Sequence, residues 1–154
     1  MKRDLPESLR QLQVSMPLTE VLQLLSGENV LLQTTARRAL PSHGGALEGG
    51  LYAGTTVHDN DPFELILLPG EFEGSWSDAD AWAKQQGGEL PSRFDALVLF
   101  KYLKSEFKPE WYWTAEPYAG DADYAWIQTF VYGRQVNDHK SSRYRARVVR
   151  RVPI

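Results

Sequence analysis

The chain has 154 residues, a usual length for one domain, and its content of 42% hydrophobic and 24% charged residues is typical of a soluble globular protein. It contains no cysteine, which excludes disulfides, thiolate zinc sites, iron–sulfur clusters and cysteine nucleophiles, and no apolar run approaches the roughly 20 residues that cross a bilayer. The net charge of −3 is uneven, because residues 134–154 carry seven Lys or Arg against one Asp (+6) and residues 1–133 carry ten against nineteen acids (−9).

Residues 1–49 are expected to form an N-terminal extension with a short helix and a strand. The helix is predicted between Pro17 and Gly27, where four apolar residues recur at helical spacing. Residues 28–35 have the branched, apolar composition of a strand. Residues 36–62, rich in Gly, His, Asp and Pro, predict an irregular connection with a brief strand from Gly50 to Thr56.

The middle of the chain predicts one buried strand and two helices. Residues 63–71 are predicted to form a strand. They contain a continuous apolar run, which is typical of a strand buried on both faces. A first helix is expected to follow Ser77 as its N-cap, with Asp78 and Asp80 in its first turn, and to end at Gly87 and Gly88. A second helix is expected after Ser92, which stands in capping-box spacing with Asp95 and precedes an apolar stripe of Ala96, Leu99, Phe100, Leu103 and Phe107.

The last third of the chain predicts strands at residues 111–114, 124–132 and 143–152, with turns near Gly120 and Gly133. Trp113 and Trp126 are expected in the core. Strands followed by two central helices and then an antiparallel sheet indicate an α+β fold.

Four segments resemble a family of uncharacterised bacterial and phage proteins: GGELPSRFDALVLFKYL, YWTAEP, YAWIQTFVYG and KSSRYRARVVRRV. Members of that family are similar to C-type-lectin-like domains, so the resemblance implies two helices packed on a small antiparallel sheet over residues 50–154. The same pattern is found in the C-terminal domain of a bacterial collagen-like adhesin that binds sulfated glycosaminoglycans. Many members of the family are encoded in prophages. The related scaffold of the formylglycine-generating oxidase depends on active-site cysteines, which this chain lacks.

Catalytic patterns are weak, so the chain is not expected to be an enzyme. It has no G-x-S-x-G elbow and no phosphate-binding glycine loop. The alternative is a glycan-acting hydrolase that uses two loop carboxylates, and such chemistry needs one acid in an apolar pocket that raises its pKa. The candidate acids, Glu110, Glu116, Asp121 and Asp123, lie among small or polar residues and are expected to be solvated.

A second alternative is calcium-dependent sugar binding, which the lectin resemblance implies. Lectin-type domains hold calcium with a Glu-Pro-Asn loop and a later Trp-Asn-Asp strand, and here Glu116-Pro117-Tyr118 is followed by residues 136–138, Val-Asn-Asp. Calcium prefers six to eight oxygen ligands. The resemblance therefore assigns Glu116, Asn137 and Asp138 as metal ligands, although Tyr118 stands where the family has an amide ligand. Otherwise no cofactor is expected.

The basic end of the chain offers a site for an anionic partner, such as an acidic glycan. If residues 143–152 form one strand, Arg143, Arg145, Arg147 and Arg151 project from one face and could bind sulfates or phosphates. The competing interpretation is that these arginines pair with the excess acids of residues 1–133. Nucleic acid is not expected, since the whole chain is acidic.

A protein partner is the third binding hypothesis. Tyr118, Asp121, Asp123 and Tyr124 lie in a loop whose composition is typical of contact surfaces, and the Gly-rich segment 43–54 could join it. The sequence thus predicts a non-enzymatic binding module, encoded by a phage or prophage and located in the cytoplasm or a virion. No membrane association is expected, and the N-terminal extension could mediate self-association.

Overall fold

A computed structural model describes residues 39–154, and the chain divides into two units, residues 1–39 and Leu40–Ile154. The helix predicted between Pro17 and Gly27 and the strand predicted at residues 28–35 lie outside the described residues. The second unit contains two α-helices and two sheets, which confirms an α+β fold. It begins at Leu40, whereas the sequence placed the boundary after residue 49. Within residues 39–154, no helix is long and apolar enough to cross a membrane.

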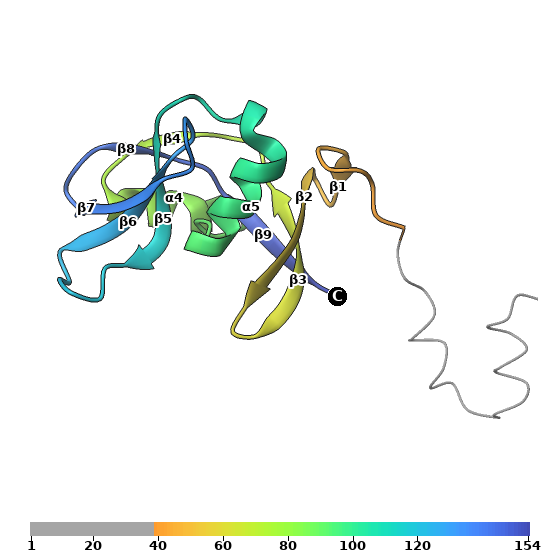
Figure 1. Cartoon of the computed structure of the whole chain (residues 1–154), viewed down its shortest axis with the longest axis horizontal. Coiled ribbons are helices and arrows are strands. Elements are labelled where there is room, and N and C mark those ends of the chain that lie inside the picture. Colours follow the sequence, from red (N-terminus) through yellow and green to blue (C-terminus); the bar gives the residue numbers. More distant parts are fainter. Residues whose placement is uncertain (1–38) are drawn as a thin grey trace, which may run out of the picture. The chain divides into compact units, whose positions relative to one another are not determined.

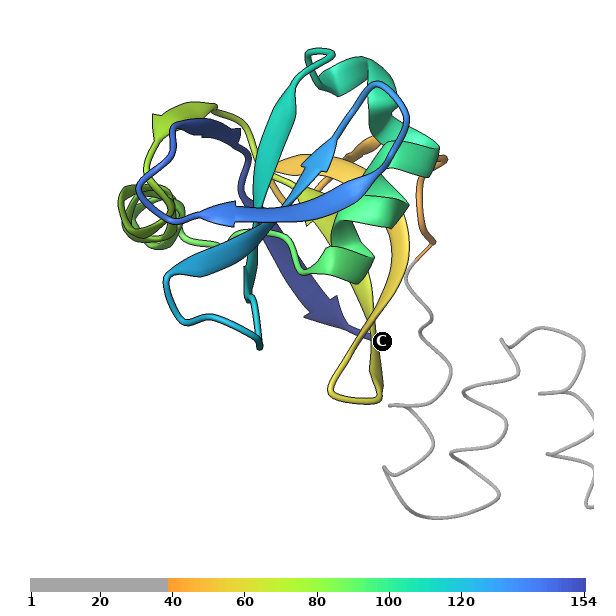
Figure 2. The same cartoon turned by 60° about the vertical axis from the view of Figure 1, so that its left-hand side comes forward.

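The first sheet, sheet A, is antiparallel with the order β1-β2-β3-β9 (Figure 1). Its strands are β1 (Ala46–Leu47), β2 (Gly50–His58), β3 (Asp61–Leu67) and β9 (Val149–Pro153). The hairpin of β2 and β3 turns at Asp59 and Asn60, which have positive φ angles of 50° and 68° (Figure 2). Asp and Asn tolerate this conformation. The last three residues of β3, Leu65 to Leu67, are all buried, as the apolar run predicted.

The second sheet, sheet B, has the order β4-β8-β5-β6-β7 and is antiparallel except for the pair of β5 and β8. Its strands are β4 (Phe72–Gly74), β5 (Trp111–Pro117), β6 (Tyr124–Thr129), β7 (Gln135–His139) and β8 (Tyr144–Ala146). The sequence predicts β5 and β6 but gives no signal for β7, whose residues QVNDH are mostly polar.

Helix α4 (Trp76–Gln85) begins two residues earlier than expected, because Ser75 and not Ser77 is its N-cap. The Ser75 hydroxyl accepts a hydrogen bond from the Asp78 amide, 3.4 Å away. The indole of Trp76 donates to the Thr114 carbonyl at 2.9 Å, which holds Trp76 against β5 at the start of the helix. The Ser75 cap and this part-buried contact of Trp76 therefore occur together at the start of α4.

Helix α5 (Arg93–Leu103) begins as predicted, with both hydrogen bonds of the Ser92–Asp95 capping box present. A 3₁₀ turn, η2 (Lys104–Glu106), follows it. Ala96, Leu99 and Leu103 are buried. The expected apolar stripe is therefore confirmed, and its two phenylalanines, Phe100 and Phe107, pack against the same cluster.

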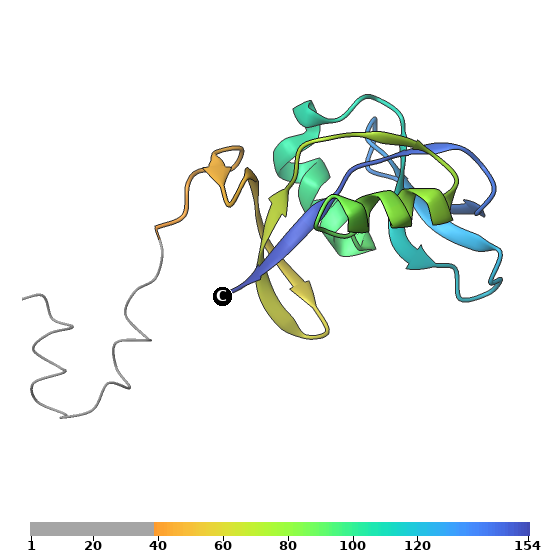
Figure 3. The ribbon, with the colours of Figure 1, turned by 180° about the vertical axis from the view of Figure 1, so that it is seen from behind.

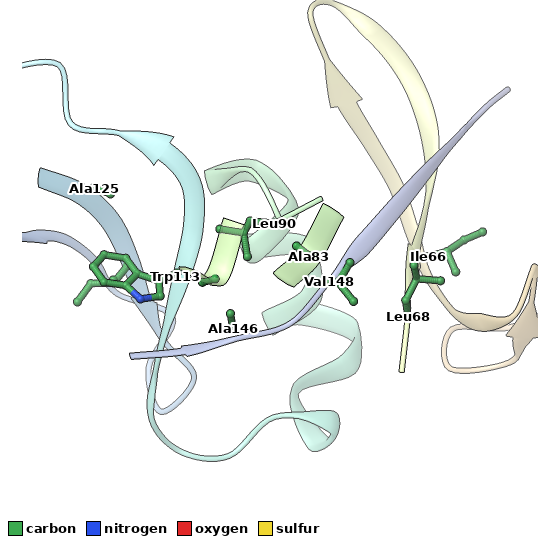
Figure 4. Close-up of a cluster of buried hydrophobic side chains, with 10 residues drawn as sticks. Ile66, Leu68, Ala83, Leu90, Trp113, Ala125, Ala146 and Val148 are labelled. Atoms are coloured by element: carbon green, nitrogen blue, oxygen red, sulfur yellow. The ribbon is translucent and has the colours of Figure 1, made fainter. Parts of the chain in front are cut away.

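Sheet B lies between the two helices. Trp113 on β5 packs in one cluster with Ala79 and Ala83 of α4, whereas its neighbour Tyr112 packs with Leu99 of α5. Alternating residues of β5 thus face opposite helices. The first cluster extends from Trp113 past Ala146 and Val148 to Ile66 of sheet A (Figure 4). One continuous core therefore connects the two sheets.

The prediction of a single strand at residues 143–152 is wrong, because this segment forms two strands that belong to different sheets. Residues 144–146 form β8 of sheet B, and β9 of sheet A begins at Val149. Between them Val148 is fully buried and its carbonyl accepts a hydrogen bond from Leu68 at 2.9 Å. The expected row of arginines on one strand face therefore does not form.

Candidate functional site

A pocket of about 280 Å³ lies beside β8. Strand β8 sits between β4 and β5, so residues that are far apart in the sequence meet there. We call it the Arg143 pocket; its lining residues are Glu73, Pro109, Glu110, Trp111, Arg143, Tyr144 and Arg145. It brings together two of the predicted arginines, one of the predicted acids and a half-buried tryptophan.

Arg145 forms a fixed wall of this pocket. Its guanidinium donates to the carboxylates of Glu110 and Glu71, the latter at 3.2 Å, and only 20% of its side chain is exposed. The Tyr112 hydroxyl also donates to Glu71, at 2.9 Å. The hydrogen bond from Arg145 lowers the pKa of Glu110. The positive charge of Arg145 is therefore neutralised by two acids of the protein itself.

Arg143 differs from Arg145 because its side chain is exposed and makes no ion pair or hydrogen bond within residues 39–154. It precedes β8 directly and lines the same pocket as the ring of Trp111. A guanidinium without a carboxylate partner retains its full capacity for bidentate bonds to an oxyanion. Arg143 is therefore the available cation of the pocket.

Arg147 lies outside the pocket and has a structural role. Its Nη1 donates to the carbonyl of Glu106 at 2.5 Å, and its guanidinium lies 5.1 Å from the centre of the Phe107 ring. Arg151, the fourth arginine of the expected row, pairs with Glu89 and with the fully buried Asp95. For Arg145 and Arg151 the structure shows the competing interpretation, pairing with acids, whereas Arg147 makes internal contacts with a carbonyl and a ring.

The loop from Tyr118 to Tyr124 is held in place by its neighbours. The edge of Tyr118 packs on Trp126 with 5.6 Å between ring centres, and Tyr124 packs similarly on His139 at 5.4 Å. The Asp121 carboxylate accepts from the Asp123 amide at 2.9 Å. Lys140 donates to the carbonyl of Ala122 at 2.6 Å. The loop therefore presents exposed acids on a fixed backbone, but none of its residues lines the Arg143 pocket.

The prediction that Trp126 lies in the core is wrong. It is half-buried, and the guanidinium of Arg93 lies 3.6 Å from the centre of its ring. Arg93 also donates to the side chain of Gln135 at 2.8 Å. The outer face of β6 thus carries a stack of Arg93, Trp126 and Tyr118, whereas Trp113 is the fully buried tryptophan of this region.

The acids proposed for hydrolysis have separate partners. Glu110 pairs with Arg145, and Glu116 accepts a hydrogen bond from the Arg93 amide at the start of α5, 2.5 Å away. Asp121 and Asp123 are exposed in their loop. A general acid needs a raised pKa, and the pKa of Glu110 is lowered. The arrangement gives the hydrolase alternative no support.

The residues assigned to calcium lie on two strands, with Glu116 on β5 and the other two on β7. The Asp138 carboxylate already accepts from the Tyr144 hydroxyl and, at 2.7 Å, from the His139 amide. Among residues 39–154, no three His, Asp or Glu side chains are grouped as metal ligands. A calcium site at Glu116, Asn137 and Asp138 stays a prediction of the resemblance.

Alkaline pH should destabilise the fold through Tyr112, which is buried, and Tyr144, which is partly buried. Burial and, for Tyr144, the bond to Asp138 raise the pKa of Tyr112 and of Tyr144 from 10.0 to about 12. Because the folded state favours the neutral phenol, this stability is complete below pH 10.0 and is lost as pH rises toward about 12. Urea unfolding across this window should show the decline.

The matched comparison is Tyr144→Phe against Tyr132→Phe, because Tyr132 is 84% exposed. The decline should be shallower in the first variant and unchanged in the second. Equal declines in both variants would contradict the assignment to Tyr144.

The pocket could not be read from the sequence, because its residues come from three segments joined by the pairing of β4, β8 and β5. Whether Arg143 is paired depends on which acids lie near it in the fold, and the local sequence pattern does not predict those neighbours. No protein-family model matches the chain, and no curated protein matches it either.

Proposed function

We propose that the chain is a non-enzymatic binding module that holds an acidic glycan in the Arg143 pocket. The observation that carries the proposal is the exposed guanidinium of Arg143, which has no partner within residues 39–154 and lies in a pocket with Trp111. The finer fold, a C-type-lectin-like domain, and the phage or prophage setting belong to this proposal. The two helices and small sheets support the C-type-lectin-like fold. The sequence resemblance supports both that fold and the phage or prophage setting.

The chemistry of the pocket suits a sugar that carries a sulfate or carboxylate. A guanidinium binds either group through paired hydrogen bonds. The half-buried Trp111 lines the pocket and offers apolar contact to a sugar ring, and Glu73 supplies an acceptor for hydroxyl groups. Arg145 adds no free charge because Glu71 and Glu110 neutralise it. The pocket thus offers one unpaired guanidinium, that of Arg143, to an acidic group of the sugar.

Binding of a heparin-derived tetrasaccharide should depend on Arg143. We expect Arg143→Gln to weaken binding about tenfold, the value of roughly one charge-assisted interaction. Isothermal titration calorimetry at several salt concentrations measures the affinity and its salt slope, which should also fall. A neutral oligosaccharide of the same length should bind weakly to both proteins.

The control is Arg134→Gln, since Arg134 is an exposed arginine on the turn before β7 and lines no part of the pocket. Its affinity should match that of the wild type. Glu110→Gln should strengthen binding several-fold, because it removes a competing carboxylate and releases the charge of Arg145. Equal losses in Arg143→Gln and Arg134→Gln would mean diffuse charge attraction and would refute the pocket.

A further inference from the structure

Strand β7 is an outer strand of sheet B, on the side of the unit away from the hairpin of β2 and β3 (Figure 1 and Figure 3). It pairs with β6 on one side and, in the described part of the chain, with no strand on the other. Its residues, Gln135–His139, include neither Lys nor Pro, which commonly keep an edge strand from pairing. The edge of β7 is therefore open to a further strand.

The backbone groups at this edge follow from the pairing of β7 with β6. The Thr129 amide donates to the Arg134 carbonyl at 3.0 Å, and this bond fixes the alternation of the ladder. Three residues of β7 therefore point their N–H and C=O groups away from β6: Gln135, Asn137 and His139.

His139 already uses its outward backbone groups. Its amide donates to the carboxylate of Asp138 at 2.7 Å, and its carbonyl accepts a hydrogen bond at 2.9 Å from the turn that follows β7. Among residues 39–154, by contrast, no hydrogen bond reaches the backbone groups that Gln135 and Asn137 point outward. The open part of the edge thus runs from Gln135 to Asn137, with Val136 at its centre.

This open stretch is complementary to itself. When a second copy of the chain pairs antiparallel with β7 about a twofold axis at Val136, Gln135 of each copy lies opposite Asn137 of the other. Each such pair exchanges N–H···O bonds in both directions, so all the free backbone groups of this stretch find partners. Val136 lies opposite Val136 of the other copy and adds an apolar contact at the axis.

The charges on both sides of Val136 also match in this register. Arg134 precedes Val136 by two residues and Asp138 follows it by two, so Arg134 of one copy lies opposite Asp138 of the other on the same face. Arg134 is exposed and forms no ion pair with any residue that the structure describes. The Asp138 carboxylate accepts from Tyr144 and His139, and its remaining lone pairs can accept from a guanidinium.

The opposite face of the edge supplies a further donor. The guanidinium of Arg93 lies 3.6 Å from the centre of the Trp126 ring, and its Nε donates to the side chain of Gln135 at 2.8 Å. Its two terminal nitrogens are not buried and have no hydrogen-bond partner between residues 39 and 154. Asn137 of a second copy, opposite Gln135, brings its side-chain amide to the same face as this guanidinium.

We propose that the partner of this edge is a second copy of the chain, bound β7 to β7 about a twofold axis at Val136. The two copies of sheet B then form one continuous sheet, held by the backbone of Gln135 and Asn137 and by the paired charges of Arg134 and Asp138. An edge this short buries less than the roughly 1,200 Å² of a stable interface, so the dimer forms at high protein concentration. None of these residues lines the Arg143 pocket, so either proposal can fail without the other.

Sedimentation equilibrium of the full chain, at concentrations up to about 1 mM, tests the association. The mass of the wild type should rise toward that of a dimer. Arg134→Glu places a carboxylate opposite Asp138 on both sides of the axis and should weaken association about tenfold. Arg143→Glu makes the same change of charge at an exposed arginine outside β7 and should associate as the wild type does.

A second pair of variants separates the backbone of Asn137 from its side chain. Asn137→Pro removes the outward N–H, at a position where an edge strand tolerates proline, whereas Asn137→Ala keeps it. Association should therefore be weaker in Asn137→Pro, with circular dichroism as the check that both variants fold. The arginine pair does not depend on the proline variant. A wild type that stays monomeric at every concentration, or equal association of Arg134→Glu and Arg143→Glu, would overturn the proposal.

Discussion

Replacing Asp95 by alanine is expected to lower the free energy of unfolding by about 3 to 5 kcal/mol, the usual cost of removing one partner of a buried ion pair. The Asp95 carboxylate is fully buried and accepts hydrogen bonds from the Ser92 amide, the Thr56 hydroxyl and the Arg151 guanidinium. Without it, Glu89, which is exposed, is the one acid within residues 39–154 that pairs with Arg151. Urea unfolding measures the difference.

Two comparisons make this prediction specific. Asp95→Asn retains the shape and one acceptor oxygen but loses the charge and the second acceptor, so its loss of stability should fall between wild type and Asp95→Ala. Asp80→Ala removes an acid that pairs with exposed Lys84 on α4, and its stability should stay near that of the wild type. If Asp95→Ala and Asp80→Ala were equally stable, the buried network would have no role in stability.

Replacing Trp113 by alanine is expected to cost about 3 to 5 kcal/mol, as for other large aromatic side chains removed from a core. Trp113 is fully buried, donates to the Gly74 carbonyl at 2.9 Å and packs edge-to-face on Tyr144 at 5.1 Å. Its loss leaves a cavity between β4, β5 and β8. Since Tyr144 lines the Arg143 pocket, glycan binding should weaken as well.

Tyr132→Ala is the control for Trp113→Ala, because Tyr132 is 84% exposed. Its free energy of unfolding should change by no more than about 0.5 kcal/mol, as at most surface positions. A Trp113→Ala protein as stable as Tyr132→Ala would contradict the position of Trp113 in the core.

The elements that the sequence predicts correctly are those with local causes. The capping box of Ser92 and Asp95 needs only residues three positions apart, and the apolar run at residues 65–67 reflects burial on both faces of one strand. The start of α4 was missed because Ser75 and Ser77 are both possible N-caps, and the contact of Trp76 with distant Thr114 goes with the earlier one. Strand β7 was missed because an edge strand with polar residues has no apolar alternation.

The arginine row failed for a similar reason. Alternating Arg and apolar residues are typical of one half-exposed strand, but consecutive burial of Val148 and Val149 does not fit that pattern. The adjacent valines were therefore a signal of the change of sheet. For the candidate site, the sequence named Arg143, Arg145 and Glu110, yet which arginine is paired depends on the order β4-β8-β5. Pairing of distant strands is not encoded in local periodicity.

The crossing at Arg147 and Val148 also determines how the described unit unfolds. Only two residues separate β8 from β9, and the Val148 carbonyl is bonded to Leu68 at the end of β3. One buried cluster also includes Ile66 of sheet A with Trp113 and Ala146 of sheet B. We therefore expect the two sheets to unfold together, so that a substitution in either one lowers the stability of both.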